Sequence, residues 1–515
     1  MGKKIKTITK IFWTLFIILL FMLLALNYYS SALFPKQEKE NPRFVKVDYI
    51  ALQNEANSIV PPQITENAKN VFVLTYHRIT KNPPVQDYEL SYEQFKNNMF
   101  ALKKAGYQTI TTQDLYLFMN NEKQLPDKSF LLTFDDGARQ AYYNGDPILK
   151  ALNYTAVMFV IVSHVMDENA SVYYLNKTEL ENMKNTGRWE IESHTYKSHF
   201  RLPISQNTAF IAPALTNKLW IANESRLETD EEYYSRVSID LEASKRLLEE
   251  SFNIHINSFA LPYGDFGERN SNHPNATNVL YDLTTQYYDL IFYEFPLRDR
   301  LYRGNYNDLQ QDGYLISRLA ADSLQDPDRL IQRIESLREV TLPYYEDYSN
   351  PDRWIRTTGE ASFVNNSIIL SNGRIGNKEG FITYLDGTYL LRNYMYSIQL
   401  KNSASSRITL ISRFISPQNY VSCVYDNNTI FISKQEKDSP ANIIKKVSIT
   451  ETALNQTFLS MSVKGSDVSC FIDGQEKITS NVPGIPLYGG VGIRAENFQT
   501  EDKTFAFGGV SISEI

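Results

Sequence analysis

The spacing of apolar residues changes once along this chain, near Pro343, and this change limits the folds that the chain can adopt. Before it, short apolar runs alternate with amphipathic stretches of helical periodicity, which predicts strands separated by helices. The predicted strands are Val71–Tyr76, Phe130–Phe134, Ala156–Val162, Trp189–Ser193, Ile256–Leu261, Leu290–Phe295 and Tyr314–Leu319. The predicted helices include Ser91–Ala105, a long one capped by Thr229 that ends near Phe252, and one from Pro327 to about Glu339. Because this alternation favours parallel strands covered by helices, we expect an α/β domain of the distorted (β/α) barrel type over residues 71–342.

The sequence pattern of residues 343–515 predicts an all-β domain. From Trp354 onward, short alternating runs are separated by turn signals such as Asn372-Gly373 and Asp473-Gly474, and helical periodicity is lacking. Many short strands of this kind predict a β-sandwich. The segment also resembles concanavalin-like jelly rolls, with Gly489–Arg494 near its end. Glycan binding and a purely structural role are both open for it.

The N-terminus predicts a membrane segment in residues 1–33. Four lysines, Lys3 to Lys10, precede the apolar run Ile11–Leu26, which places the N-terminus in the cytoplasm and the rest of the chain outside. We favour a retained single-pass anchor, with cleavage as a signal peptide near Ser30–Ala32 as the alternative. Residues 34–70 are polar and contain four prolines, which predicts a linker.

Charge and cysteine content exclude several functions. The net charge is -7, and a mildly acidic chain gains no affinity for nucleic acid from counterion release, so we expect no nucleic-acid partner. Cys423 and Cys470 are the only cysteines, too few for a cysteine-rich zinc site. We expect them to be free and packed inside sandwich strands, with a disulfide as the less favoured alternative.

Polar side chains gather at the ends of three predicted strands. The segments are Leu132–Gly137, which contains two adjacent aspartates, Ser193–His199, which contains two histidines, and Phe259–Gly264. Adjacent aspartates are more often a solvated turn, but here they close an apolar strand, where carboxylates are costly unless they have partners. Because the carboxyl ends of barrel strands converge on one face, one carboxylate and two imidazoles would form a site for Zn²⁺ or a similar divalent ion. Such an ion activates water, and the second carboxylate is then free to act as a general base.

These segments resemble the NodB-homology polysaccharide deacetylases, carbohydrate esterase family 4. The matching blocks, in order, are Val71–Arg78, Gly106-Tyr107, Thr133–Gly137 and Phe259–Gly264, so the resemblance covers about Val71 to Glu339. It implies that Asp136, His194 and His199 are the metal ligands and that Asp135 is the general base. It also implies supporting or substrate-binding roles for Thr195, which would brace the histidine loop by hydrogen bonding, and for Pro262, Gly264 and Arg318. The backbone N–H of Tyr263 would be the oxyanion donor.

The chain departs from the family pattern in three ways. The Arg that many members carry just before the Pro-Tyr block is absent, because Phe259-Ala260-Leu261 stand there. The second histidine follows the first by five positions instead of the commoner four, which is similar to the branch that deacetylates poly-β-1,6-N-acetylglucosamine. The late histidine that usually acts as general acid is missing, because no histidine follows His273. His77, at the end of the first predicted strand, would lie on the same barrel face and is the expected substitute.

The function expected from these residues is metal-dependent hydrolysis of N-acetyl groups on a cell-surface or extracellular polysaccharide. The expected partners are the polysaccharide and, through the N-terminal segment, a membrane. Removal of O-acetyl groups is the alternative within the same class of enzyme. A non-catalytic surface glycan-binding protein is the alternative from another class, but Asp135, Asp136, His194 and His199 are all present, which favours an enzyme.

Overall fold

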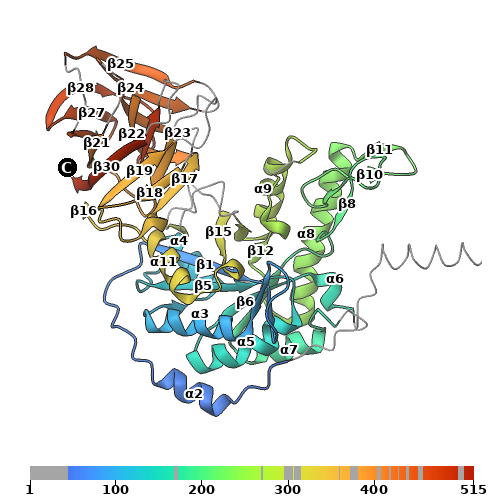
Figure 1. Ribbon diagram of the computed structural model, residues 1–515. Helices are drawn as coiled ribbons and strands as arrows, with labels where there is room; N and C mark the ends of the chain where they lie inside the picture. Colours follow the sequence, from blue (N-terminus) through green and yellow to red (C-terminus); the bar gives the residue numbers. More distant parts are fainter. Residues whose placement is uncertain are drawn as a thin grey trace, which may run out of the picture.

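A computed structural model describes most of the chain and shows two bodies, a barrel and a β-sandwich (Figure 1). The described residues are 44–167, 172–267, 271–294, 305–306, 315–358, 360–371, 381–402, 407–416, 419–426, 428–436, 440–450, 456–496 and 504–515. In this part of the chain no helix combines the length and apolar character needed to cross a membrane. The predicted anchor lies in residues 1–33, outside the described residues.

Parallel strands close into a barrel, as the sequence predicts. In ring order they are β1 (Asn70–Tyr76), β5 (Ser129–Phe134), β6 (Ala156–Val160), β7 (Trp189–Ser193), β12 (Ser258–Ala260), β13 (Leu290–Glu294) and β15 (Leu315–Ala320). The ring closes because Leu74 of β1 aligns with Leu132 of β5 on one side and with Leu319 of β15 on the other. Two short strands lie outside it, β4 (Gln108–Thr109) beside β5 and β14 (Asn305–Tyr306) antiparallel to β1.

Strands β1, β5 and β6 are nearly unbroken apolar runs because both of their faces are buried, whereas β7 contains Glu190 and Glu192. Along β1, Val71 and Val73 belong to the cluster inside the barrel, whereas Phe72 and Leu74 pack in the larger cluster under the helices. The helices that cover the outside and the ends of the barrel are α3 (Tyr92–Lys104), α4 (Thr112–Met119), α5 (Arg139–Leu152), α6 (Val162–Val165), α7 (Lys177–Asn185), α8 (Asp230–Phe252), α9 (Ala276–Tyr287) and α11 (Pro327–Leu337). This alternation around the sheet confirms the predicted α/β barrel.

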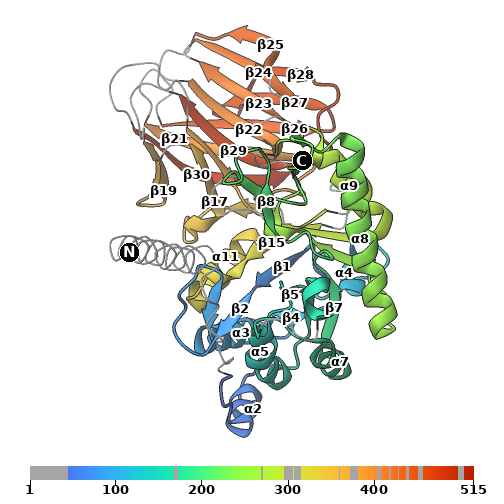
Figure 2. The ribbon, with the colours of Figure 1, turned by 90° about the vertical axis from the view of Figure 1, so that its right-hand side faces the viewer.

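Several short elements complete this body. They are β2 (Arg78–Thr80) and β3 (Glu89–Ser91), the excursion β8 (Arg201–Pro203), β9 (Ile211–Pro213), β10 (Trp220–Ile221) and β11 (Arg226–Leu227), and the 3-10 turns η1 (Pro262–Gly264) and η2 (Ala321–Ser323). The excursion follows β7 and returns the chain to α8, so it borders the barrel face on which β7 ends (Figure 2).

The predicted linker is partly folded, which corrects that prediction. Helix α2 (Tyr49–Asn57) begins at Asp48, whose side chain accepts a hydrogen bond from the Ala51 N–H, and it lies beneath α5 (Figure 1). Leu52 and Ala56 are buried in the barrel's outer core. Besides these two, only the partly buried Tyr49 of this helix packs against the core, so the helix depends on its packing and leaves a weak signal in the sequence.

The sandwich consists of two antiparallel sheets, which confirms the predicted all-β domain. One has the order β18 (Glu360–Phe363), β19 (Ser367–Ser371), β30 (Thr504–Glu514), β21 (Tyr394–Asn402), β26 (Thr457–Lys464), β27 (Asp467–Ile472), β28 (Gln475–Asn481), with β16 (Tyr344–Tyr345) also beside β30. The other has the order β17 (Trp354–Thr358), β20 (Phe381–Leu385), β29 (Gly490–Glu496), β22 (Arg407–Ser416), β23 (Asn419–Asp426), β24 (Thr429–Glu436), β25 (Asn442–Ser448). Side chains from both sheets, such as Ile398 and Leu410, share one core.

The two cysteines form a disulfide, so the expectation of free thiols is wrong. Cys423 on β23 and Cys470 on β27 lie on different sheets with their Cα atoms 5.8 Å apart, and the bond joins the two sheets through the core. Both residues are inward-facing strand positions, as expected. Their pairing depends on which strands face each other across the sandwich, and strand periodicity does not reveal that.

The barrel and the sandwich meet at a hydrogen-bonded junction next to α11 (Figure 1). The Val340 N–H donates to the Gly387 carbonyl at 2.7 Å, and Arg333 of α11 pairs with Asp386 at 3.0 Å. Gly387 has a φ of +74°, and a β-carbon there would lie 2.1 Å from the carbonyl oxygen of Arg338. Only glycine permits this close approach of the two backbones. The short turn η3 (Pro351–Arg353) completes the contact, because Arg353 donates to the Glu335 carbonyl of α11 at 2.9 Å.

Candidate active site

A pocket of about 420 Å³ opens where β1, β5, β7 and β13 end. Its lining residues are His77, Tyr88, Asp135, Asp136, Tyr173, Tyr174, His194, His199, Tyr263 and Glu294. The structure thus brings together all three predicted metal ligands and the three predicted catalytic residues, which are separated by up to 186 positions in the sequence (Tyr263 minus His77). The reason is the barrel itself, since parallel strands deliver their carboxyl ends to one face.

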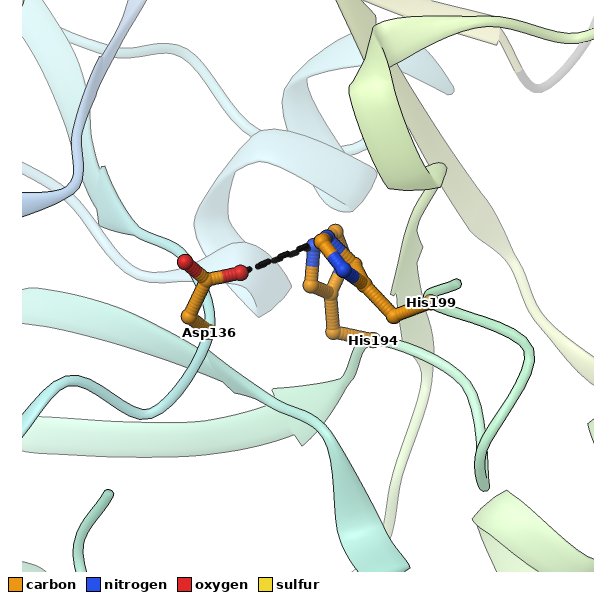
Figure 3. A group of neighbouring side chains, drawn as sticks. All are labelled: Asp136, His194 and His199. Atoms are coloured by element: carbon orange, nitrogen blue, oxygen red, sulfur yellow. Dashed lines mark ion pairs between the residues drawn. The ribbon is translucent and has the colours of Figure 1, made fainter. Parts of the chain in front are cut away.

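Asp136, His194 and His199 point toward one another (Figure 3). Oδ1 of Asp136 lies 3.7 Å from Nε2 of His194 and 3.3 Å from Nε2 of His199. Ligand atoms about 2.1 Å from one tetrahedral ion are roughly 3.4 Å apart, so these separations suit a shared metal. Oδ1 of Asp136 is buried and has no hydrogen-bond partner among the described residues, which leaves it available for coordination. Two nitrogen donors and one oxygen donor fit a divalent transition metal.

Neighbouring groups fix the orientation of these three side chains. Nδ1 of His194 lies 2.7 Å from the carbonyl oxygen of Ala260 on β12, so it carries the proton and Nε2 faces the pocket as an acceptor. The hydroxyl of Tyr173 donates to Oδ2 of Asp136 at 3.1 Å. Burial lowers the pKa of His194 to about 4, against the opposing effect of Asp135. The imidazole is therefore neutral near pH 7, which is the form that binds a metal.

Asp135 points to a different partner from its neighbour. Its two carboxylate oxygens accept hydrogen bonds from the Arg318 guanidinium at 2.6 and 2.7 Å, and Arg318 also pairs with Glu294 at 3.2 Å. Burial alone would raise the pKa of Asp135, but Arg318, with help from His194 and His77, holds it well below the usual range. Asp135 is therefore ionised while it lies at the wall of the pocket.

His77 lies beside Asp135, as His194 does. Its Nε2 is 4.0 Å from Oδ2 of Asp135, and its Nδ1 is 2.8 Å from Oδ2 of Asp322. Burial lowers the pKa of His77, but the carboxylate of Asp322, followed by those of Glu294 and Asp135, outweighs it and raises the pKa to about 10. The imidazole is therefore protonated near neutrality. The predicted position of His77, on the same face as Asp135 and His194, is what the structure shows.

The Pro-Tyr-Gly segment forms the turn η1 beside the two histidines. The ring of Tyr263 lies 4.9 Å from that of His199, and its φ is +58°. Pro262 is buried and begins the turn. A β-carbon on Gly264 would lie 2.3 Å from Cβ of Glu294, so glycine is required for the turn to pack against β13. The supporting positions of Pro262 and Gly264 are therefore structural: they set where the Tyr263 backbone lies.

The hydrogen bond made by Thr195 comes from its backbone and not from its hydroxyl. Its hydroxyl is buried without a hydrogen-bond partner in the part of the chain that the structure describes. The residue contributes instead through its backbone, which has a φ of +76° and whose carbonyl oxygen accepts a hydrogen bond from the Val162 N–H. Thr195 thus turns the chain between the two histidines, and its side chain does not brace the loop.

Sequence reasoning missed several residues that shape this pocket, namely Glu294, Asp322, Tyr88, Tyr173 and Tyr174. Glu294 ends β13 and Asp322 follows the end of β15, so the convergence of strand ends could have indicated both. Tyr173 lies in a loop after α6, and nothing in the local sequence distinguishes it from its neighbour Tyr174.

Comparisons with known proteins agree with the class that the barrel and its strand-end residues define. Residues 122–280 match the family described as Polysaccharide deacetylase. The barrel therefore contains a polysaccharide deacetylase domain of the NodB type, a class of hydrolase that acts on carbon–nitrogen bonds other than peptide bonds.

Its relatives include named deacetylases. A poly-beta-1,6-N-acetyl-D-glucosamine N-deacetylase from Staphylococcus aureus (strain MRSA252) is 27% identical over 218 residues, which are 40% of this chain and 68% of that protein. A protein of the same name from Escherichia coli (strain K12) is 26% identical over 235 residues, which are 42% of this chain and 35% of that one. A solved de-N-acetylase from Aggregatibacter actinomycetemcomitans is 21% identical with a TM-score of 0.43, covering 51% of this chain and 98% of that chain.

Proposed function

We propose that the chain removes N-acetyl groups from a polysaccharide of the poly-β-1,6-N-acetylglucosamine class and that this reaction depends on a divalent metal, with Zn²⁺ favoured. The observation that carries the proposal is that the two adjacent aspartates contact different partners. Asp136 faces two histidines, whereas Asp135 faces a guanidinium and stays ionised. Two relatives that match part of this chain carry the name poly-beta-1,6-N-acetyl-D-glucosamine N-deacetylase.

The proposed roles follow from the geometry and from the separation of two pKa values. Asp136, His194 and His199 would hold the ion, which acidifies a water and polarises the substrate carbonyl when bound. Asp135, ionised and next to this group, accepts the proton of the attacking water. His77, whose pKa is about 10, donates a proton to the departing amine. A base with a lowered pKa and an acid with a raised one can both be in their working forms at neutral pH.

The other residues bind and orient the substrate. The Tyr263 N–H donates to the oxygen that becomes negatively charged, at a backbone position that Pro262 and Gly264 set. Arg318 keeps Asp135 charged and directed into the pocket. Four tyrosines, Tyr88, Tyr173, Tyr174 and Tyr263, surround the opening, and their rings offer flat apolar surfaces with polar edges that suit sugar rings.

Acetate release from defined polymers tests the proposed function. We expect the purified protein to release acetate from poly-β-1,6-N-acetylglucosamine faster than from peptidoglycan or chitin oligomers. Chelation should abolish the release and added Zn²⁺ should restore it. Release from O-acetylated glycans alone, or full activity after the metal has been removed, would contradict the proposal.

The role of His77 predicts a difference between two kinds of substrate. His77→Gln should keep the metal but lose amide hydrolysis by on the order of 10²-fold, because the amine must be protonated as it leaves. Hydrolysis of an O-acetyl ester should fall less, since an alcohol leaves more easily. Metal content and both rates, measured on the same preparation, check this; equal losses on both substrates would contradict the role of general acid.

The pH profile gives an independent check on the same residue. Amide hydrolysis should fall as the pH rises through about 10, where His77 loses its proton. Asp322→Asn removes the main charge that raises this pKa, so the alkaline limb should move to lower pH.

We also propose that the protein is tethered to a membrane through residues 1–33, with the barrel and sandwich outside the cell. The support is the order of Lys3–Lys10 and the apolar run Ile11–Leu26. Protease added to intact cells should then cleave sites after Phe34. Protection of that region until the cells are lysed would refute this orientation.

A further inference from the structure

The loop from His194 to His199 has a backbone conformation that is costly by itself. Thr195 has a φ of +76°, which a β-branched residue rarely adopts, and its buried hydroxyl has no partner among the described residues. Such conformations persist only where the surroundings impose them. On one side, the first turn of α6 imposes this one, because the Ser163 N–H donates to the Tyr196 carbonyl at 2.8 Å.

On the other side of the loop lies Asp240, in the middle of α8. One carboxylate oxygen accepts a hydrogen bond from the Tyr196 N–H at 3.0 Å, and the other accepts one from the Lys197 N–H at 2.9 Å. The hydroxyl of Ser198 forms a third hydrogen bond with this carboxylate. Asp240 is only 6% exposed, so its charge has been taken out of water to make these contacts.

A buried carboxylate is costly unless its hydrogen bonds compensate for the lost solvation. At Asp240 these bonds come from three consecutive residues, which lie between the two histidines. We infer that Asp240 is a positioning residue for the metal site, holding the loop in the shape that directs His194 and His199 at Asp136. This inference rests on the proposed metal site, but its test does not depend on turnover.

The decisive variant is Asp240→Asn. The amide has one acceptor oxygen, and its NH₂ group would face one of the two backbone N–H donors, so at least one hydrogen bond is lost. The matched control is Glu242→Gln on the same helix, where the exposed carboxylate pairs only with the neighbouring Arg246 at 2.9 Å in the described structure. Both substitutions exchange a carboxylate for an amide.

Amide hydrogen exchange in the metal-free protein measures directly how well the loop between the two histidines is held. In Asp240→Asn, peptides that contain Tyr196 and Lys197 should exchange at least about tenfold faster, while peptides from β1 and β5 stay protected. The Kd for Zn²⁺ should rise by about 10- to 100-fold, as for other residues that orient metal ligands indirectly. The absorption bands of the Co²⁺-loaded protein should also change, and Glu242→Gln should match the wild type in all three measurements.

Two results would overturn the inference. One is wild-type exchange and wild-type Zn²⁺ affinity in Asp240→Asn; the other is loss of protection across the whole barrel, which would mean a general structural role. If Asp240→Asn does not fold, Ser198→Ala removes only the third hydrogen bond and should weaken Zn²⁺ binding in the same direction, so unchanged binding would also refute the inference. A wild-type protein that binds no metal would instead refute the proposed metal site.

Discussion

The His194→Ala variant is expected to lose its bound metal and to deacetylate its substrate slower by on the order of 10³-fold, because a catalytic ion contributes several kcal/mol to stabilising the transition state. His194 is 1% exposed, and its Nε2 faces Asp136 while its Nδ1 is held by the Ala260 carbonyl. Removing the imidazole leaves two ligands, fewer than the three that a catalytic zinc site normally has. Metal content by mass spectrometry and acetate release from the polymer measure the two effects separately.

His255→Ala is the matched control for this variant. His255 has a side chain that is 73% exposed and pairs with Glu249 at 3.2 Å, away from the pocket. The control should keep both metal and activity. Asp136→Ala should lose metal and activity as His194→Ala does. Full metal occupancy in a protein that carries both substitutions would refute the assignment of the site.

Asp135→Asn should have the second-largest effect on turnover, and it should distinguish the role of Asp135 from that of Asp136. The amide cannot accept the proton of the attacking water, so we expect turnover to fall by on the order of 10²-fold or more while the metal stays bound. Asp135 also holds the buried Arg318, so a general loss of stability must be distinguished from a loss of catalysis.

Asp146→Asn controls for that second effect. Asp146 accepts three hydrogen bonds from Arg188, at 3.0 to 3.1 Å, and one from the Trp189 indole at 2.9 Å, and it takes no part in the pocket. Its variant loses a carboxylate–guanidinium pair of the same kind and should retain turnover. If Asp135→Asn loses the metal and Asp136→Asn keeps it, the roles of the two aspartates are reversed.

The barrel could be predicted closely from the sequence, and the reason is physical. Strands such as β5 and β6 are buried on both faces, so each is a nearly continuous apolar run, and each begins within one residue of its predicted start. β7 contains Glu190 and Glu192 and still has the predicted bounds, Trp189–Ser193. The site followed from the same strands, since polar residues such as Asp135 and His194 stand directly after their ends. In a parallel barrel those positions must meet.

The errors concern contacts between distant segments. Helix α2 depends on packing against α5, and the Cys423–Cys470 bond depends on which strands of the two sheets face each other. The side chain that holds the loop after Thr195 could not be predicted either, because the carboxylate that accepts its backbone hydrogen bonds belongs to Asp240, 45 positions beyond Thr195 and on another element (240 minus 195). The local sequence around a residue does not indicate which distant segment it will contact.

The junction at Gly387 has a mechanical consequence. The Val340–Gly387 backbone hydrogen bond, the Arg353 side chain on the Glu335 carbonyl and the Arg333–Asp386 pair join the end of the barrel to the sandwich, so rotation of one body against the other would have to break them. These contacts restrict the positions that the sandwich can take relative to the pocket at the barrel mouth. A sandwich resting on a polymer or a cell wall would act as a spacer, setting which stretch of that material comes within reach of the pocket.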